Sequence, residues 1–192
     1  MSSGSPLTNQ FLIAMPNMAD PNFSRTVTFL FDHSEKGAMG IVINRPTRMQ
    51  LAEVFQQLKL PCTNEIAERQ FVLQGGPVQI EQGFVIHRSD KSGNGGNWEY
   101  SVQVSDTIQI TTSRDILASM ARGEGPDGAL VALGYAGWGA GQLEAELTAN
   151  SWLTVAVDEH VLFNLPFEDR WQAAVRLLGI DLSRLGPDAG HA

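Results

Sequence analysis

The segment with the clearest potential for ligand chemistry is residues 133–143, where four glycines separate an apolar run from a helical pattern. Glycine permits positive φ and lets a ligand approach the backbone amides closely. The N-terminus of the following helix would offer free N–H groups and a positive dipole end to an anion. The segment therefore suggests an anion or nucleotide cradle, in which Trp138 supplies a stacking face and Gln142 an amide.

Two observations weaken the cradle interpretation. The segment lacks the Gly-Lys-Ser/Thr of a Walker motif and the acidic partner of a dinucleotide fingerprint. Glu144 and Glu146 also fall in the first turns of the expected helix, where they already complement its dipole and would repel a phosphate. The alternative is a tight strand-to-helix turn in which Trp138 packs among small neighbours.

Two further segments could add polar groups to such a site. Asn44 and Arg45 end the apolar run 40–43, and an arginine can bind a carboxylate or phosphate through two parallel hydrogen bonds. The alternative, which the pattern favours, is a strand terminus in which Asn44 closes a turn and Arg45 forms a surface ion pair. The pair Gly75–Gly76 indicates either a close backbone approach or a simple turn. The predicted ligand-binding residues are Asn44, Arg45, Gly75, Gly76, Gly137, Trp138, Gly139, Gly141 and Gln142.

The residue pattern predicts no catalytic residues, no metal site and no cofactor. The four histidines (His33, His87, His160 and His191) have no partner at metal-ligand spacing. Residues 32–34 read Asp-His-Ser, but neighbours on a strand point to opposite faces and cannot form a triad. No Gly-x-Ser-x-Gly nucleophile elbow occurs, and nothing around Cys62 indicates an activated thiol.

The elements that would position these residues can be read from hydrophobic periodicity. Helical spacing predicts four helices, near residues 51–58, 113–123, 143–147 and 167–178. Short apolar or alternating runs predict half-buried or buried strands at 10–15, 26–31, 38–44, 71–73, 84–87, 102–104, 108–110, 130–133 and 152–157. The polar loop 92–97 should be mobile.

This order of elements favours an α+β fold, a single domain over residues 1–192 with a flexible N-terminus at 1–6. Early strands cluster as hairpins and late strands alternate with helices, so we expect a mostly antiparallel, curved or barrel-like sheet with helices packed against it. A doubly wound parallel sheet fits poorly because the first half lacks crossover helices.

Composition and charge restrict the function classes. With 43% hydrophobic and 18% charged residues, the chain is typical of a soluble globular protein. A single cysteine excludes an internal disulfide and a cysteine-based zinc site. The N-terminus has no signal-peptide pattern, and the longest uncharged run is too short to cross a bilayer, so a cytoplasmic location is expected. The net charge of −8 argues against direct nucleic-acid binding and against anionic membranes.

At the same segments the chain resembles the AlgH/YqgE family of bacterial proteins. The matching stretches lie within a span from residue 7 to residue 192 and include 11–16, 37–46, 75–78, 134–143, 150–153 and 190–192. The resemblance implies a single α+β domain with no assigned activity and no catalytic residues to carry over. Some members carry a transcriptional-regulator label, from a link to alginate production. If the protein regulates transcription, its negative charge favours an indirect route, through a protein partner or a small ligand, over direct binding to DNA.

The leading hypothesis is therefore a cytoplasmic regulatory module that binds a small anionic ligand or a protein partner. The first alternative is an enzyme that acts on a nucleotide or another small anionic substrate through backbone amides and water. The second alternative is a regulator that binds DNA directly, which the net charge disfavours. The oligomeric state stays open.

Overall fold

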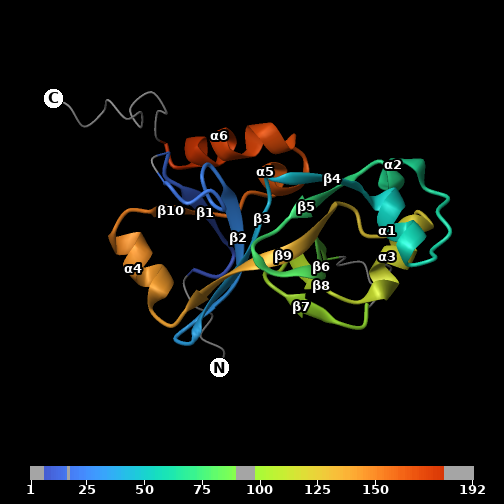
Figure 1. Cartoon of the computed structure of the whole chain (residues 1–192), viewed down its shortest axis with the longest axis horizontal. Helices are drawn as coiled ribbons and strands as arrows, with labels where there is room; N and C mark the ends of the chain where they lie inside the picture. The colour runs from blue at the N-terminus through green and yellow to red at the C-terminus, as the bar shows by residue number, and fades with distance from the viewer. Residues whose placement is uncertain (1–6, 17, 90–97, 180–192) are drawn as a thin grey trace.

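The computed structural model describes residues 7–16, 18–89 and 98–179, and its centre is a curled, mostly antiparallel sheet (Figure 1). Eight of the ten strands follow the order β10-β1-β2-β3-β9-β6-β8-β7, while β4 pairs with β5 and β5 joins β9 in parallel. Their bounds are β1 (Gln10–Ala14), β2 (Val27–Ser34), β3 (Gly37–Val42), β4 (Pro46–Gln50), β5 (Phe71–Gln74), β6 (Val78–Arg88), β7 (Ser101–Gln103), β8 (Ile108–Thr111), β9 (Ala129–Gly139) and β10 (Trp152–Ala156). The predicted α+β class is confirmed.

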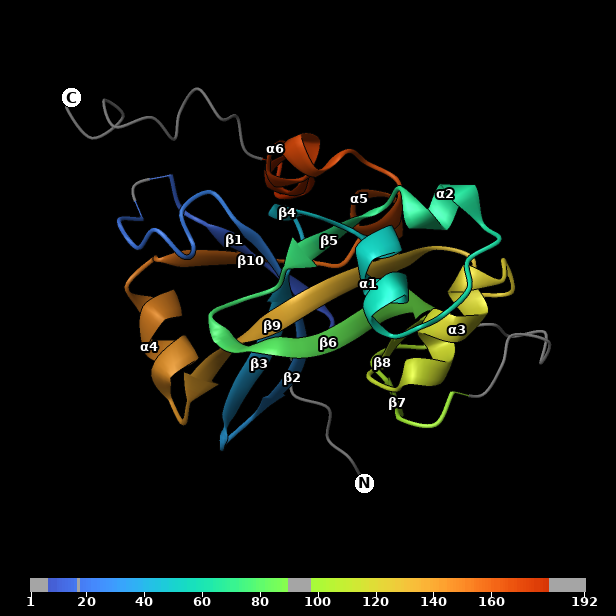
Figure 2. The same cartoon turned by 45° about the vertical axis from the view of Figure 1, so that its right-hand side comes forward.

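Within the described residues six helices cover this sheet. Figure 2 shows that they gather in separate groups around it. The first group is α1 (Leu51–Gln57), α2 (Glu65–Glu68) and α3 (Arg114–Ala121), the second is α5 (Glu159–Phe163) with α6 (Phe167–Leu177), and the third is α4 (Gln142–Thr148) alone. None of the helices within the described ranges combines the length and the apolar character needed to cross a bilayer.

Each helix group covers its own cluster of buried side chains. The α5–α6 core includes Phe11, Phe29, Leu130, Ala132 and Val175. The α1–α3 core includes Leu51, Phe55, Trp98, Ile116 and Val131. The α4 core includes Leu12, Ala136, Trp138, Leu143 and Trp152. Strand β9 contributes residues to all three clusters because it runs the length of the sheet.

The predicted end of the strand that corresponds to β9 was wrong. The sequence predicts a strand that ends at residue 133 and a glycine-rich loop after it, but β9 continues through Gly139 and leaves only a short turn before α4. Its second half pairs with β3, where Gly40 faces Ala136. At Gly134 the backbone has φ +78°, and an added Cβ would lie 2.4 Å from the carbonyl oxygen of Gly76. Glycine therefore lets two backbones approach within the sheet rather than forming a loop.

Other differences from the expected elements are small. Strand β4 and the helices α2 and α5 were not predicted, and β7 is exposed rather than half-buried, with Val102 61% exposed. Ser113 occupies the N-cap position of α3, but its hydroxyl donates to the Asp115 carboxylate instead of accepting from a helix amide. The segments 1–6 and 92–97 and the tail 190–192 lie outside the described residues.

Candidate functional site

Asn44 and Arg45 lie between β3 and β4, and both side chains bind backbone groups at the start of β2 or in the segment just before it. Asn44 accepts a hydrogen bond from the Val27 amide and donates one to the Arg25 carbonyl, each at 2.9 Å. Arg45 donates through both terminal nitrogens to two carbonyls of the same segment, at 2.6 and 2.9 Å. Burial lowers the pKa of Arg45, while the nearby charge of Asp20 opposes that shift. These two side chains fasten a loop.

Gly75 and Gly76 pack directly against β9. A Cβ added to Gly75 would lie 2.3 Å from the carbonyl oxygen of Gly134. A Cβ added to Gly76 would lie 2.1 Å from the carbonyl carbon of Tyr135. The Gly75 amide also donates to the Leu133 carbonyl at 2.8 Å. Of the two readings of this glycine pair, the geometry supports a close approach of two backbone segments within the protein.

The remaining five predicted residues, in β9, in the turn after it and at the start of α4, are Gly137, Trp138, Gly139, Gly141 and Gln142. Trp138 is only 6% exposed and packs against Trp152 and Phe23, with ring centroids 5.9 and 6.2 Å away. The Gln142 side-chain oxygen accepts from the Gly139 amide at 3.0 Å. The alternative in which Trp138 packs among small neighbours matches this arrangement. None of the nine predicted residues lines the pocket described next.

The α1–α3 pocket lies between these two helices and strands β6, β8 and β9, and it has a volume of about 540 Å³. Volumes of this order are typical of small-molecule sites. Its walls are mainly aliphatic, with Val54 and Leu58 on one helix side, Leu117 on the other, and Val131 and Leu133 on the sheet. Such walls favour a ligand with an apolar body.

The polar edge of the α1–α3 pocket is the junction between β8 and α3. Thr111, Thr112, Ser113 and Arg114 line the pocket in succession, so hydroxyl groups and the start of a helix meet there. The Arg114 guanidinium donates to the Leu58 carbonyl at the end of α1, which ties the two helices together. The pocket thus combines mainly apolar walls with hydrogen-bonding groups at this edge, and Gln57 and Glu81 add polar side chains elsewhere in the lining.

Behind this edge lies His87, whose side chain is fully buried on β6. Its Nδ1 lies 3.0 Å from the Arg88 carbonyl and its Nε2 lies 2.7 Å from the Thr111 hydroxyl. A carbonyl can only accept, so Nδ1 carries the hydrogen and Nε2 accepts from Thr111. The Ser101 hydroxyl lies 2.7 Å from the same Thr111 oxygen. Burial lowers the pKa of His87, although the Arg88 carbonyl opposes the shift.

Sequence reasoning considered His87 only as a metal ligand and passed over this chain of hydrogen bonds. The available signal was its position two residues after Val85 in β6, which places both side chains on the face covered by α1 and α3. A histidine on an apolar strand face must be buried and must find partners. Across the described residues, no three His, Cys, Asp or Glu side chains gather in a group that could hold a metal ion.

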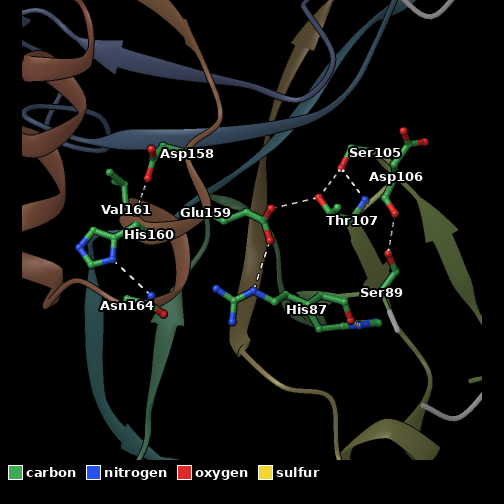
Figure 3. A network of polar contacts seen from close by, with 11 residues as sticks. His87, Ser89, Ser105, Asp106, Thr107, Asp158, Glu159, His160, Val161 and Asn164 are labelled. Carbon is green, nitrogen blue, oxygen red and sulfur yellow. Dashed lines mark hydrogen bonds and ion pairs between the residues drawn. The ribbon is translucent and has the colours of Figure 1, made fainter. Parts of the chain in front are cut away.

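A second polar network joins α5 to the sheet (Figure 3). The Glu159 carboxylate accepts from the Arg88 Nε and from the Thr107 hydroxyl, both at 3.2 Å. Asp158 caps the start of α5 by accepting from the Val161 amide at 3.0 Å. Arg88 and Glu159 form an ion pair and Asp158 caps the helix, so this network stabilises the docking of α5 on the sheet.

Comparison with known proteins identifies the family. A model of the AlgH-like family matches residues 11–183. A UPF0301 protein of Thioalkalivibrio sulfidiphilus is 53% identical over 192 residues, covering all of both chains. The solution structure of AlgH from Pseudomonas aeruginosa is 48% identical with a TM-score of 0.77, again over both full chains. A crystal structure from Corynebacterium diphtheriae, 19% identical with a TM-score of 0.72 over 92% of this chain and 89% of its own, shares the fold. This chain belongs to the AlgH-like family.

Proposed function

We propose that this protein is a binding module that takes a small, largely apolar molecule with a polar or anionic end into the α1–α3 pocket. The observation that carries the proposal is the pocket of about 540 Å³ with aliphatic walls and one hydrogen-bonding edge at Thr111–Arg114. Ligand sites commonly combine apolar walls with a few convergent polar groups. An anionic end would depend on the Arg114 guanidinium, because Asp115 in the first turn of α3 and Glu81 in the pocket lining are negatively charged.

Gly83 offers a direct way to test this proposal. It lines the α1–α3 pocket on the same face of β6 as Val85, and a Cβ built on it meets no atom within 4 Å. The Cβ of a larger side chain therefore has space at this position, and Gly83→Leu is designed to occupy the pocket. Gly139→Leu is the matched control, because a Cβ there meets only the Gln142 side-chain oxygen, at 3.9 Å, on another part of the sheet.

The probe is 1-anilinonaphthalene-8-sulfonate, which joins an apolar body to an anionic group. We expect one saturable site in the native protein, with NMR shifts at the amides of Thr111 and Thr112. Gly83→Leu should weaken binding at least tenfold, or about 1.4 kcal/mol, and Gly139→Leu should leave it unchanged. Equal binding by the two variants, or no saturable binding by the native protein, would refute the proposal.

An enzyme is the second candidate, and the contact between His87 and Thr111 is the observation that favours it. A neutral imidazole that accepts from a hydroxyl is the arrangement of a base and its nucleophile. In that role Thr111 would attack an ester carbonyl, and its proton would pass to Nε2 and then to the leaving alkoxide. The full burial of Thr111 favours the binding role. Hydrolysis of p-nitrophenyl acetate that is lost in both Thr111→Val and His87→Gln would favour the enzyme instead.

A further inference from the structure

The Arg170 guanidinium is a buried charge for which the described residues provide no carboxylate partner. Arg170 lies on α6 and is 2% exposed. Its Nε donates to the Leu165 carbonyl at 3.2 Å, its Nη1 donates to the Ile43 carbonyl, and its Cζ lies 4.7 Å from the Phe167 ring centroid. Burial lowers its pKa to about 10, so the side chain stays protonated near neutral pH.

This arrangement leaves part of the guanidinium unused. Buried charges in proteins are normally paired, because removing an ion from water is costly. Arginine has five N–H donors, and the two carbonyls engage only Nε and Nη1. The Nη2 group makes no hydrogen bond to any residue in the described ranges. The remaining donors suit a bidentate or single contact with an incoming carboxylate.

Arg170 opens onto a groove, the Arg170 groove, of about 790 Å³ between α2 and the α5–α6 pair. Its walls include the aromatic rings of Phe71, Phe163 and Phe167, and Ile66 lies on its rim with 86% of its surface exposed. The groove shares no lining residue with the α1–α3 pocket. It is therefore a separate site with one buried positive charge among apolar walls.

The charges around the groove restrict the class of ligand. Asp127 and Glu168 also line it, so a dianion such as phosphate would meet two negative groups for one positive group. A monoanion needs only the one guanidinium, and an apolar body would cover Phe71, which is 41% exposed, and Ile66. Aromatic or branched aliphatic acids satisfy both conditions.

We propose that the Arg170 groove binds a small monocarboxylic acid with an apolar body, its carboxylate paired with the Arg170 guanidinium. This site is independent of the α1–α3 pocket and of the function proposed for it. The probe is benzoate, and benzamide serves as the neutral analogue of the same shape. In the full-length protein, benzoate should shift the amide resonances of Phe71 and Phe167 in a saturable way, and benzamide should bind at least tenfold more weakly.

The variants separate recognition from a purely structural role. Arg170→Gln should abolish the difference between benzoate and benzamide, whereas Arg176→Gln, an exposed arginine on the same helix, should retain it. Because Arg170→Gln can lower stability, the rim variant Ile66→Asp provides a second test. Ile66 is exposed, so this substitution should change the stability of the fold little. It should weaken benzoate binding more than Ile66→Asn does. Equal binding of benzoate and benzamide, shifts confined to the α1–α3 pocket, or native affinity in Arg170→Gln would overturn the proposal.

Discussion

His87 and Arg170 show two ways in which this fold accommodates a buried polar side chain. The His87 ring has a hydrogen-bond partner at each nitrogen, and burial lowers its pKa. Arg170 stays charged, and the carbonyls around it satisfy only part of its guanidinium. Both ring nitrogens of His87 are hydrogen-bonded within the protein, whereas the Nη2 group of Arg170 has no hydrogen-bond partner among the described residues. We therefore expect the first to respond to pH and the second to an added carboxylate.

For His87 the sign of the pH response follows from its lowered pKa. Below the pKa of an ordinary histidine, about 6.5, the unfolded chain binds a proton that the folded protein does not. Protonation then favours the unfolded state, so His87 makes the protein less stable as pH falls from 7 to 5, by up to about 1.4 kcal/mol per pH unit. Urea unfolding at several pH values measures this. His87→Gln should lose less stability over that range, and equal losses in both proteins would contradict the assignment.

At the scale of elements, local periodicity was enough to predict most strands and the four longer helices. The elements that were missed, such as α2 (Glu65–Glu68) and α5 (Glu159–Phe163), are too short to show a helical period. The glycines of β9 were misread because glycine in a strand and glycine in a loop look alike in sequence. Only the partner backbone at Gly76 shows that Gly134 lies within the sheet.

The candidate pocket could not be predicted, because its residues are distant in sequence. Met49, Gly83, Thr111 and Val131 meet only after the sheet has curled and α1 and α3 have packed on one face. No short segment among them has a recognisable motif. By contrast, Asn44 and Arg45 were conspicuous in sequence because they end a strand, and the structure shows them fastening the segment before β2.

That fastening leads to a prediction about Arg45. Removing its two hydrogen bonds to backbone carbonyls in Arg45→Ala should lower the free energy of unfolding by about 1–2 kcal/mol, and should speed hydrogen exchange at the Val27 amide. Arg48→Ala is the control, since Arg48 is exposed on β4. Binding of the sulfonate probe in the α1–α3 pocket should not change. A loss of probe binding with unchanged stability would assign Arg45 to a ligand site instead.

At the scale of the whole molecule, one strand links the three cores. Leu130 of β9 packs in the α5–α6 core, Val131 in the α1–α3 core and Ala136 in the α4 core. Strand β9 is held by continuous ladders of backbone hydrogen bonds to β3 and β6. If its residues in one core separate from their neighbours, the ladders that hold its residues in the other two cores are disrupted as well. The three cores should therefore unfold together, even though separate helices cover them.

The four tryptophans report on this coupling. Trp98 lies in the α1–α3 core, Trp138 and Trp152 lie in the α4 core, and Trp171 packs against the α5–α6 core. In protein labelled with 5-fluorotryptophan, all four ¹⁹F resonances should lose native intensity at one urea midpoint, as a two-state domain requires. Leu130→Ala should lower that midpoint equally for all four, with a stability loss of about 2–5 kcal/mol. Separate midpoints would show that the cores are independent units and that β9 does not couple them.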